Sequence, residues 1–420
     1  MSWLFHRANQ ESIMNPFFGI VGVFIILIIA FLLSTNRKRI KLRIIVWGIG
    51  LQLIFSLLIL KVPFVRLQFF YVDLLFKKLI NFSNAGSDFL FKSFIPGVGY
   101  HNALVNFAFR ALPMIIFFSS LISMLYFLGI PQLLIKGISK ILEKTMKTSA
   151  AETLSVSANI FIGQTEAPIL IRPFISKMTN SEIATVMTGG FATAAGSVLA
   201  LYVLWLDSIP GIAGHLLAAS IMSAPASIVI AKIIFPESLK QSSTKLLNID
   251  MLKKDENIID AIVRGASDGL KLAANVGAML IAFVSIISMI NYFFGFIFNQ
   301  TLQQTLSFFF RPLAWTMGIP WIEAKFVGIL MAEKIILTEL IAYSSLSDLI
   351  REDLISNRSA IISSYALCGF ANFSSIGIQL GGLGTMAPNR KKDLSKIAFK
   401  AMIGGALASF LTATIAGILI

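Results

Sequence analysis

The chain has 420 residues, of which 56% are hydrophobic and only 13% are charged, and its mean hydropathy is +0.81. An average soluble domain has roughly 25% charged residues, so this composition excludes a soluble globular protein and indicates an all-α protein that crosses a membrane several times. The net charge of +14 does not indicate a nucleic-acid partner, because the cations fall in clusters between apolar segments and not on a basic face with interleaved aromatic residues.

About eight apolar segments are long enough to cross a hydrocarbon core of about 30 Å at about 1.5 Å per residue. They lie near residues 14–33, 43–60, 103–130, 182–206, 211–235, 267–298, 359–383 and 396–420. Basic clusters between them predict cytoplasmic loops. These clusters are Arg37–Arg43, Lys136–Lys147, Lys253–Lys254 and Arg390–Lys392. An even number of spans then places both ends of the chain on the outer side.

Two stretches, residues 149–178 and 321–346, fit none of these spans. Each is apolar on both flanks and broken in the middle, the first at Gly163–Pro168 and the second around Glu333–Glu339. Backbone that leaves helix geometry at membrane depth loses its internal hydrogen bonds, so it persists only where protein or a water-filled cavity satisfies it. The sequence therefore predicts two re-entrant helical hairpins.

A span interrupted by small and hydroxylated residues follows each hairpin. The interruptions are Gly189–Ser197 after the first hairpin and Asn372–Gly384 after the second. Both predict broken helices. The order of hairpin, broken span and complete span thus occurs twice, which predicts the inverted repeat of a secondary transporter, with the solute site where the breaks meet.

This order divides the chain into five regions. Their bounds and contents are 1–100, two transmembrane helices and an external amphipathic segment around Phe69–Phe76; 101–148, a scaffold helix and a cytoplasmic interfacial helix; 149–235, the first hairpin repeat; 236–320, a cytoplasmic connector and a scaffold helix; and 321–420, the second hairpin repeat. We expect the two hairpin repeats to form the transport domain.

A carboxylate at membrane depth costs roughly 2.5–3.5 kcal/mol even on a forgiving insertion scale, so Glu166 is a candidate solute ligand. The structural alternatives are that Glu166 pairs with Arg172 or Lys177 and that Glu339 pairs with Lys334. Two glutamates in equivalent hairpins, each followed by a broken span, favour a solute site.

Packing is the alternative interpretation of the small residues. Glycines in membrane helices more often mediate close helix packing than ligand contact, and the segment Gly377–Gly381 fits the small-xxx-small pattern. Asn372 is equally consistent with an interhelical hydrogen bond and nothing more.

Four motifs also occur in a fixed order: Gly163–Pro168, Met187–Ser197, Glu333–Tyr343 and Phe370–Gly377. With these motifs the chain resembles the concentrative nucleoside transporters in their bacterial eight-helix form, over about residues 95–420. The resemblance implies a cation-coupled symporter of the bacterial inner membrane that imports nucleosides such as uridine, cytidine and adenosine, and that assembles as a homotrimer.

The resemblance also implies the roles of individual residues. The nucleobase ligands are Gln164, Thr165 and Glu166 with Val198 beside them, the ribose ligands are Glu339, Asn372 and Ser375, and Phe370 lines the pocket. A carboxylate that accepts from two vicinal hydroxyls makes charge-assisted hydrogen bonds, which are roughly twice as strong as neutral ones. Thr338 stands where the family commonly has Asn, so the fine substrate preference is open.

Sodium is the coupling ion that the resemblance favours. The implied ligands are Asn159, Ile162, Thr193 and Ala194, mainly through main-chain carbonyls and with the Thr193 hydroxyl as the side-chain ligand. Coupling to protons stays open, because several bacterial relatives use protons and a site built mainly from backbone leaves a weak sequence signature.

We do not expect an enzyme. His6, His101 and His215 are isolated, no span holds clustered aspartates, and no glycine-rich loop ends in Gly-Lys-Ser/Thr. A channel is the remaining alternative, but polar breaks that hold a solute suit alternating access better than a continuous pore.

Overall fold

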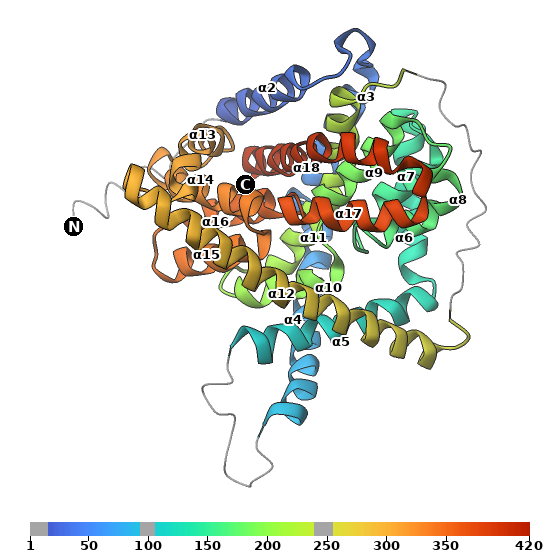
Figure 1. The fold of residues 1–420 in the computed structure, drawn as a ribbon, viewed down its shortest axis with the longest axis vertical. Coiled ribbons are helices and arrows are strands. Elements are labelled where there is room, and N and C mark those ends of the chain that lie inside the picture. The colour runs from blue at the N-terminus through green and yellow to red at the C-terminus, as the bar shows by residue number, and fades with distance from the viewer. Residues whose placement is uncertain (1–15, 93–105, 239–254) are drawn as a thin grey trace.

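The computed structural model describes residues 16–92, 106–238 and 255–420 (Figure 1). The predicted cytoplasmic pair Lys253–Lys254 and the histidines His6 and His101 lie outside the described residues. Within the described residues the chain forms helices and no strand, as the all-α prediction requires.

Helices of very different length follow one another along the described chain. In chain order the α-helices are α2 (Pro16–Leu32), α3 (Leu42–Lys61), α4 (Pro63–Phe91), α5 (Leu112–Phe127), α6 (Ile130–Met146), α7 (Ala150–Ala158), α8 (Arg172–Ile175), α9 (Asn180–Ala192), α10 (Gly196–Trp205), α11 (Ile212–Ile234), α12 (Ile258–Phe298), α13 (Leu302–Thr316), α14 (Trp321–Ile336), α15 (Glu339–Arg351), α16 (Asn357–Leu367), α17 (Phe373–Met386) and α18 (Lys391–Leu419). Shorter helical turns are η1 (Arg37–Arg39), η3 (Phe107–Ala111), η4 (Ala167–Ile171) and η5 (Pro388–Arg390).

Six helical segments among the described residues are long and apolar enough to cross a membrane. These are Leu42–Lys61, Phe107–Phe127, Asn180–Trp205, Ile212–Ile234, Ile258–Phe298 and Pro388–Leu419. Helix α2 has 17 residues, and the segment 359–383 is divided between α16 and α17, of 11 and 14 residues. The number of eight spans therefore stays a prediction.

Helix α13 is an element that the sequence analysis did not predict. It begins with a capping box, in which the Thr301 side chain accepts from the Gln304 N–H and the Gln304 side chain accepts from the Thr301 N–H. A Thr followed three residues later by Gln is a known start signal of helices, so the sequence did contain the information.

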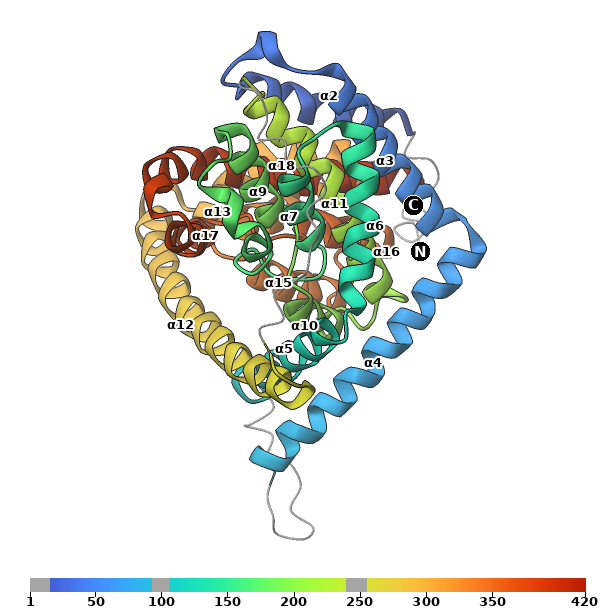
Figure 2. The same ribbon diagram turned by 90° about the vertical axis from the view of Figure 1, so that its right-hand side faces the viewer.

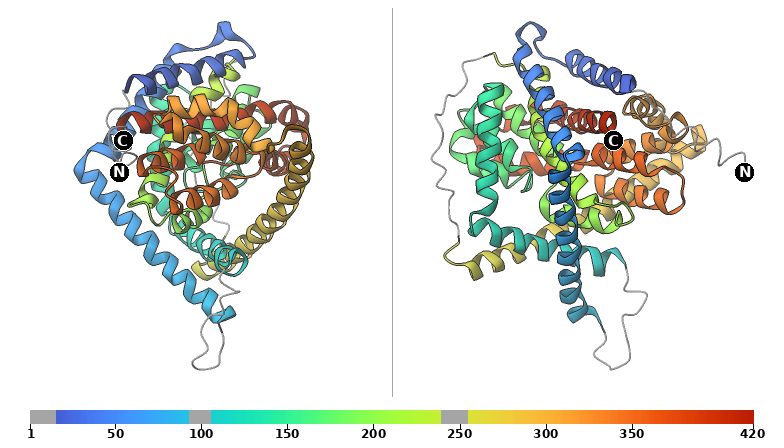
Figure 3. Two further views of the ribbon diagram at one scale, coloured as in Figure 1. Left: turned by 90° about the vertical axis from the view of Figure 1, so that its left-hand side faces the viewer. Right: turned by 180° about the vertical axis from the view of Figure 1, so that it is seen from behind.

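Two long helices, α4 and α12, lie on opposite sides of a central bundle and approach each other near α5 (Figures 2 and 3). Within the bundle, α18 packs against α9, α11, α16 and α17. It therefore joins the broken helices of both repeats to one core.

Helix α12 packs on α5 through a stripe of small residues. The buried members of this stripe are Ala261, Gly265, Gly269 and Ala273. A Cβ atom at Gly265 would lie 2.7 Å from the Cα atom of Ser120, and one at Gly269 would lie 2.8 Å from the Cα atom of Ile116. The two backbones approach each other as closely as in small-xxx-small helix pairs. This contact holds together the helices of the two predicted scaffold regions.

Helix α4 contains the predicted amphipathic segment and extends it to 29 residues. Its Asp73 is buried and accepts a hydrogen bond from the Ala213 N–H at 3.0 Å, at the start of α11. A carboxylate at a helix N-terminus satisfies an N–H group that has no partner within the helix. Farther along α4, Asp88 pairs with Arg110 at 3.0 Å. Helix α4 is thus tied to the rest of the described chain by polar contacts as well as by packing.

Candidate functional site

The second hairpin consists of α14 and α15, separated by the two residues Leu337 and Thr338. Thr338 caps α15, because its side chain accepts from the Ile341 N–H at 3.4 Å. Glu339 is then the first residue of α15, where the partial positive charge of the helix N-terminus stabilises a carboxylate. The helix–break–helix form agrees with the prediction, while its re-entrant course through a membrane stays a prediction.

The carboxylate of Glu339 is buried, and each of its oxygens accepts a hydrogen bond. The Tyr202 hydroxyl donates to Oε1 at 3.1 Å, and the Asn372 amide donates to Oε2 at 2.8 Å. Tyr202 belongs to α10 of the first repeat, and its ring stacks on that of Tyr343 with 4.1 Å between the centroids. Both repeats therefore contribute to the position of this carboxylate.

Lys334 does not act as the ion-pair partner that was the structural alternative for Glu339. Its fully buried ammonium group donates to the main-chain oxygens of Ala366 and Cys368, at 2.8 and 2.9 Å. These oxygens lie at the C-terminal end of α16, where a cation is favourable. Lys334 therefore stabilises the second broken helix.

Asn372 is the N-cap of α17. Its Oδ1 accepts from the Ser375 N–H at 2.8 Å and from the Ser374 hydroxyl at 2.6 Å, so the Nδ2 end must face Glu339. The predicted ribose ligands Glu339, Asn372 and Ser375 are thus one connected group. The simple alternative for Asn372, an interhelical hydrogen bond, is also present in this group. Phe370 lies two residues earlier, half-buried, and its carbonyl accepts from the Asn372 N–H at 2.9 Å.

The first hairpin has a longer irregular tip. After α7 ends, residues 159–166 form turns, and η4 and α8 follow. The N–H groups of Glu166 and Ala167 both donate to the Gly163 carbonyl at 3.0 Å. Gln164 is buried, Thr165 is half-buried and Glu166 is exposed. The two hairpin glutamates therefore differ in their surroundings.

The tip of the first hairpin contacts α17 of the second repeat. Gln379 donates to the Oε1 of Gln164 at 2.9 Å and to the main-chain oxygen of Met187 at 3.1 Å. A Cβ atom at Gly382 would lie 3.2 Å from the Cγ2 of Thr165. Two of the predicted nucleobase ligands thus lie against the helix that carries Ser375.

The packing interpretation of Gly377 and Gly381 is wrong for the described chain. A Cβ atom at either position would have no other atom within 4 Å. The polar contacts from this segment are made by Gln379, which lies between the two glycines. An amide inside an apolar run is the signal that identifies it, because polar side chains at membrane depth are rare.

The first broken helix is formed by α9 and α10, with the break at residues 193–195. The Gly196 N–H donates to the Phe161 carbonyl in the hairpin tip at 3.3 Å, and a Cβ atom at this position would lie 2.8 Å from that oxygen. Glycine is required here for the close approach. Val198 follows in the first turn of α10 and is buried.

The residues of the implied sodium site border this contact. Asn159 is fully buried, its amide donates to the Ser155 carbonyl at 3.1 Å, and its Oδ1 has no hydrogen-bond partner in the part of the chain that the structure describes. The Thr193 hydroxyl donates to the Gly189 carbonyl at 3.0 Å, which leaves its oxygen lone pairs as acceptors. Ile162 and Ala194 are buried as well. Oxygen ligands of this kind suit a hard cation.

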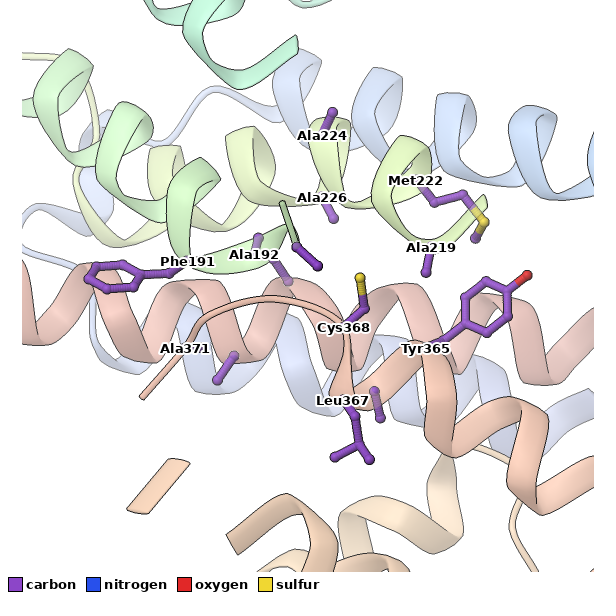
Figure 4. Packing of buried hydrophobic residues seen from close by; sticks show 14 of the residues in the cluster. Phe191, Ala192, Ala219, Met222, Ala224, Ala226, Tyr365, Leu367, Cys368 and Ala371 are labelled. Atoms are coloured by element: carbon purple, nitrogen blue, oxygen red, sulfur yellow. The ribbon is translucent and has the colours of Figure 1, made fainter. Parts of the chain in front are cut away.

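The two breaks lie beside each other at the centre of the bundle. Gly369 has a φ of +101°, and a Cβ atom there would lie 2.5 Å from the carbonyl carbon of Ala192. Figure 4 shows Phe191 and Ala192 at the end of α9 next to Cys368 and Ala371 of the second break. Two broken helices that meet at the centre of a helical bundle are the arrangement found in secondary transporters.

Comparison with known proteins gives the family. Three family profiles match the chain, described as "Na+ dependent nucleoside transporter N-terminus" over residues 21–94, "Nucleoside recognition" over 108–208 and "Na+ dependent nucleoside transporter C-terminus" over 215–417. The chain is thus a membrane transporter and not an enzyme. It belongs to the concentrative nucleoside transporter family.

Individual relatives support this assignment. The uncharacterized transporter YutK of Bacillus subtilis is 42% identical over 97% of this chain and 100% of its own length. A structure of CNTnw in an inward-facing substrate-bound state has 39% sequence identity and a TM-score of 0.87, over 96% of this chain and 97% of that one. Solute carrier family 28 member 3 of Mus musculus is 39% identical over 98% of this chain, which spans only 60% of the mouse protein.

Proposed function

We propose that the protein is a symporter that imports nucleosides together with a cation, with sodium as the favoured ion. The observation that carries this proposal is the connected group of Glu339, Asn372 and Ser375, buried where the two broken helices meet. A buried carboxylate is expensive at membrane depth, and it marks a solute site.

The ribose hydroxyls bind to the second repeat. A carboxylate oxygen has two lone pairs, so Glu339 can accept from substrate hydroxyls while Tyr202 and Asn372 hold it in place. Ser375 lies in the first turn of α17 and completes the set.

The nucleobase binds to the first hairpin. Gln164 and Glu166 together present donors and acceptors to a base edge, with Thr165 and Val198 beside them and Phe370 lining the pocket. Uridine, cytidine and adenosine are the proposed substrates.

Sodium is cotransported from a site formed by the first hairpin tip and the first broken helix, at Asn159, Ile162, Thr193 and Ala194. The buried acceptor oxygens of Asn159 and Thr193 support this choice. A proton is the second candidate ion, since a site built mainly from backbone leaves a weak sequence signature.

The transport cycle moves the hairpin repeats, residues 149–235 and 321–420, against a scaffold from 101–148 and 236–320. The close packing of α5 on α12 supports a rigid scaffold. Residues 1–100 form the N-terminal spans and the external helix. We assign the protein to the bacterial inner membrane as a homotrimer.

Uptake of labelled uridine, cytidine and adenosine into proteoliposomes tests the proposal, with the sodium and the proton gradient imposed separately. We expect accumulation that requires inward-directed sodium. Uptake that ignores sodium and collapses with a protonophore selects the proton, and no uptake of any nucleoside under either gradient refutes the proposed function.

A further inference from the structure

We propose that Gln379 is a positioning residue that determines which end of the Gln164 amide faces the nucleobase. The inference rests on the proposed function, because it concerns the site in which Gln164 is a base ligand. Gln379 belongs to α17 of the second repeat, and Gln164 to the first hairpin. The base-binding half of the site is therefore completed by the opposite repeat.

The hydrogen bonds of Gln379 have a defined direction. Its amide lies 3.1 Å from the Met187 carbonyl, which can only accept, so the NH₂ end must point there. The same NH₂ group lies 2.9 Å from the Gln164 amide, whose oxygen is the atom that can accept. The NH₂ end of Gln164 is consequently turned away from Gln379. The site thus offers the Gln164 NH₂ group to the base as a hydrogen-bond donor. The Met187 carbonyl determines this orientation, because it fixes the Gln379 amide, which in turn fixes the Gln164 amide.

Packing keeps the two amides in this arrangement. A Cβ atom at Gly190 would lie 2.6 Å from the Nε2 of Gln379 and 3.0 Å from the Cβ of Gln164. Only glycine at this position of α9 leaves room for both side chains. Gln379 is also four residues from Ser375, so the two share one face of α17. One helix face therefore carries a ribose ligand and the residue that orients a base ligand.

The buried state of Gln379 supports a role beyond packing. The residue is 1% exposed, and its Oε1 has no hydrogen-bond partner within the described ranges. A buried carbonyl without a partner is destabilising, and an apolar side chain of similar shape would avoid this. The NH₂ end, with two acceptors, is the part of the side chain that the structure uses.

A specific substrate requirement follows. A base that accepts a hydrogen bond, through a carbonyl oxygen or a ring nitrogen, is bound by the NH₂ end of Gln164. Ribosylbenzene keeps the ribose and a planar ring but has no acceptor on the ring. Its inhibition constant therefore reports binding to the site without a hydrogen bond from Gln164 to the base.

The test is Gln379→Met in proteoliposomes, with the KM for uridine and the inhibition constant of ribosylbenzene against uridine uptake. We expect the uridine KM to rise roughly tenfold, as for one lost hydrogen bond, while the ribosylbenzene constant changes less than about twofold. Gln52→Met is the matched control. Gln52 is also fully buried and has one unpartnered oxygen within the described chain, but it lies in α3 and donates to the Gly48 carbonyl at 3.4 Å. Both constants should stay at wild-type values in this control.

Equal increases for both compounds, or no change for either, would overturn the inference. If Gln379→Met does not fold, Gly190→Ala provides the same test, because it displaces both amides and removes no hydrogen-bonding group. Its selective loss of uridine affinity is again the expected result. Failure of the proposed function looks different, since the wild-type protein would then take up no nucleoside at all.

Discussion

The two hairpins have the same place in their repeats but hold their glutamates differently. The first has an irregular tip at residues 159–166 and an exposed Glu166, whereas the second has a break of two residues and a buried Glu339 with two hydrogen-bond donors. A preorganised group binds with less loss of entropy. The second hairpin, whose carboxylate is held by two donors, therefore suits the proposed binding of ribose, which all the proposed substrates share. The irregular first tip suits the nucleobases, which differ between these substrates.

The hairpin bases also differ. Glu152, in the first turn of α7, pairs with the buried Lys232 at 2.7 Å. Glu323, in the first turn of α14, accepts instead from the N–H and hydroxyl groups of Ser356, at 3.1 and 2.9 Å. The first hairpin is therefore anchored by a buried ion pair and the second by hydrogen bonds at the start of α16.

The largest expected effect is at the base of the first hairpin. Lys232→Met leaves Glu152 and Glu237 buried without their cation. Breaking a buried ion pair by removing one partner costs about 3–5 kcal/mol. We expect a large drop in the thermal unfolding midpoint of the purified protein, and a much smaller drop for Glu323→Gln.

Two variants sharpen this prediction. Glu152→Gln combined with Lys232→Met should recover part of the lost stability, because the two residues are coupled. Lys271→Met is the control, since this lysine is exposed on α12. A Lys232→Met protein as stable as the wild type would contradict the anchoring role of the ion pair.

The next effect concerns the hairpin tips. Glu339→Gln removes the charge that would bind two ribose hydroxyls, and we expect kcat/KM for uridine to fall about 100-fold. Glu166→Gln keeps an acceptor at an exposed position, so its loss should stay below about tenfold. Uridine uptake kinetics of both variants provide the measurement. Wild-type affinity in Glu339→Gln would refute the ribose assignment. Equal losses of kcat/KM in Glu339→Gln and Glu166→Gln would show that the two hairpin tips contribute equally to binding.

The sequence predicted the helical class, the two broken helices and the meeting of their breaks in the fold. The breaks could be predicted because a membrane segment tolerates a run of polar and small residues only where protein or water satisfies the backbone. It did not predict α13, and it placed the break of the span 359–383 at Asn372–Gly384, whereas the chain leaves helix geometry between Leu367 and Phe373, at Gly369 and the Asn372 cap. Hydropathy averages over such a break, since the flanking residues are equally apolar.

The contacts between repeats could not be predicted. Tyr202 in an apolar helix has the composition of an ordinary packing residue, and only the fold brings it to Glu339, 137 positions later in the chain. Gln379 and Gln164 are separated by 215 positions. In both cases a side chain of one repeat holds a proposed substrate-binding residue of the other. This pairing depends on helix geometry and leaves no local pattern in the sequence.

The smallest expected effect tests whether Tyr202 of the first repeat holds Glu339 of the second. Tyr202→Phe keeps the stacked ring and removes one of the two donors to Glu339, so we expect the KM for nucleosides to rise about three- to tenfold. Because ribose is common to all substrates, uridine and adenosine should be affected equally, in contrast to the base-selective loss expected for Gln379→Met. Tyr343→Phe is the control: it removes the hydroxyl that donates to the Ser364 carbonyl at 2.7 Å and leaves Glu339 its donors. If Tyr202→Phe changes the preference between uridine and adenosine, the proposed ribose-binding and base-binding groups are not positioned independently of each other.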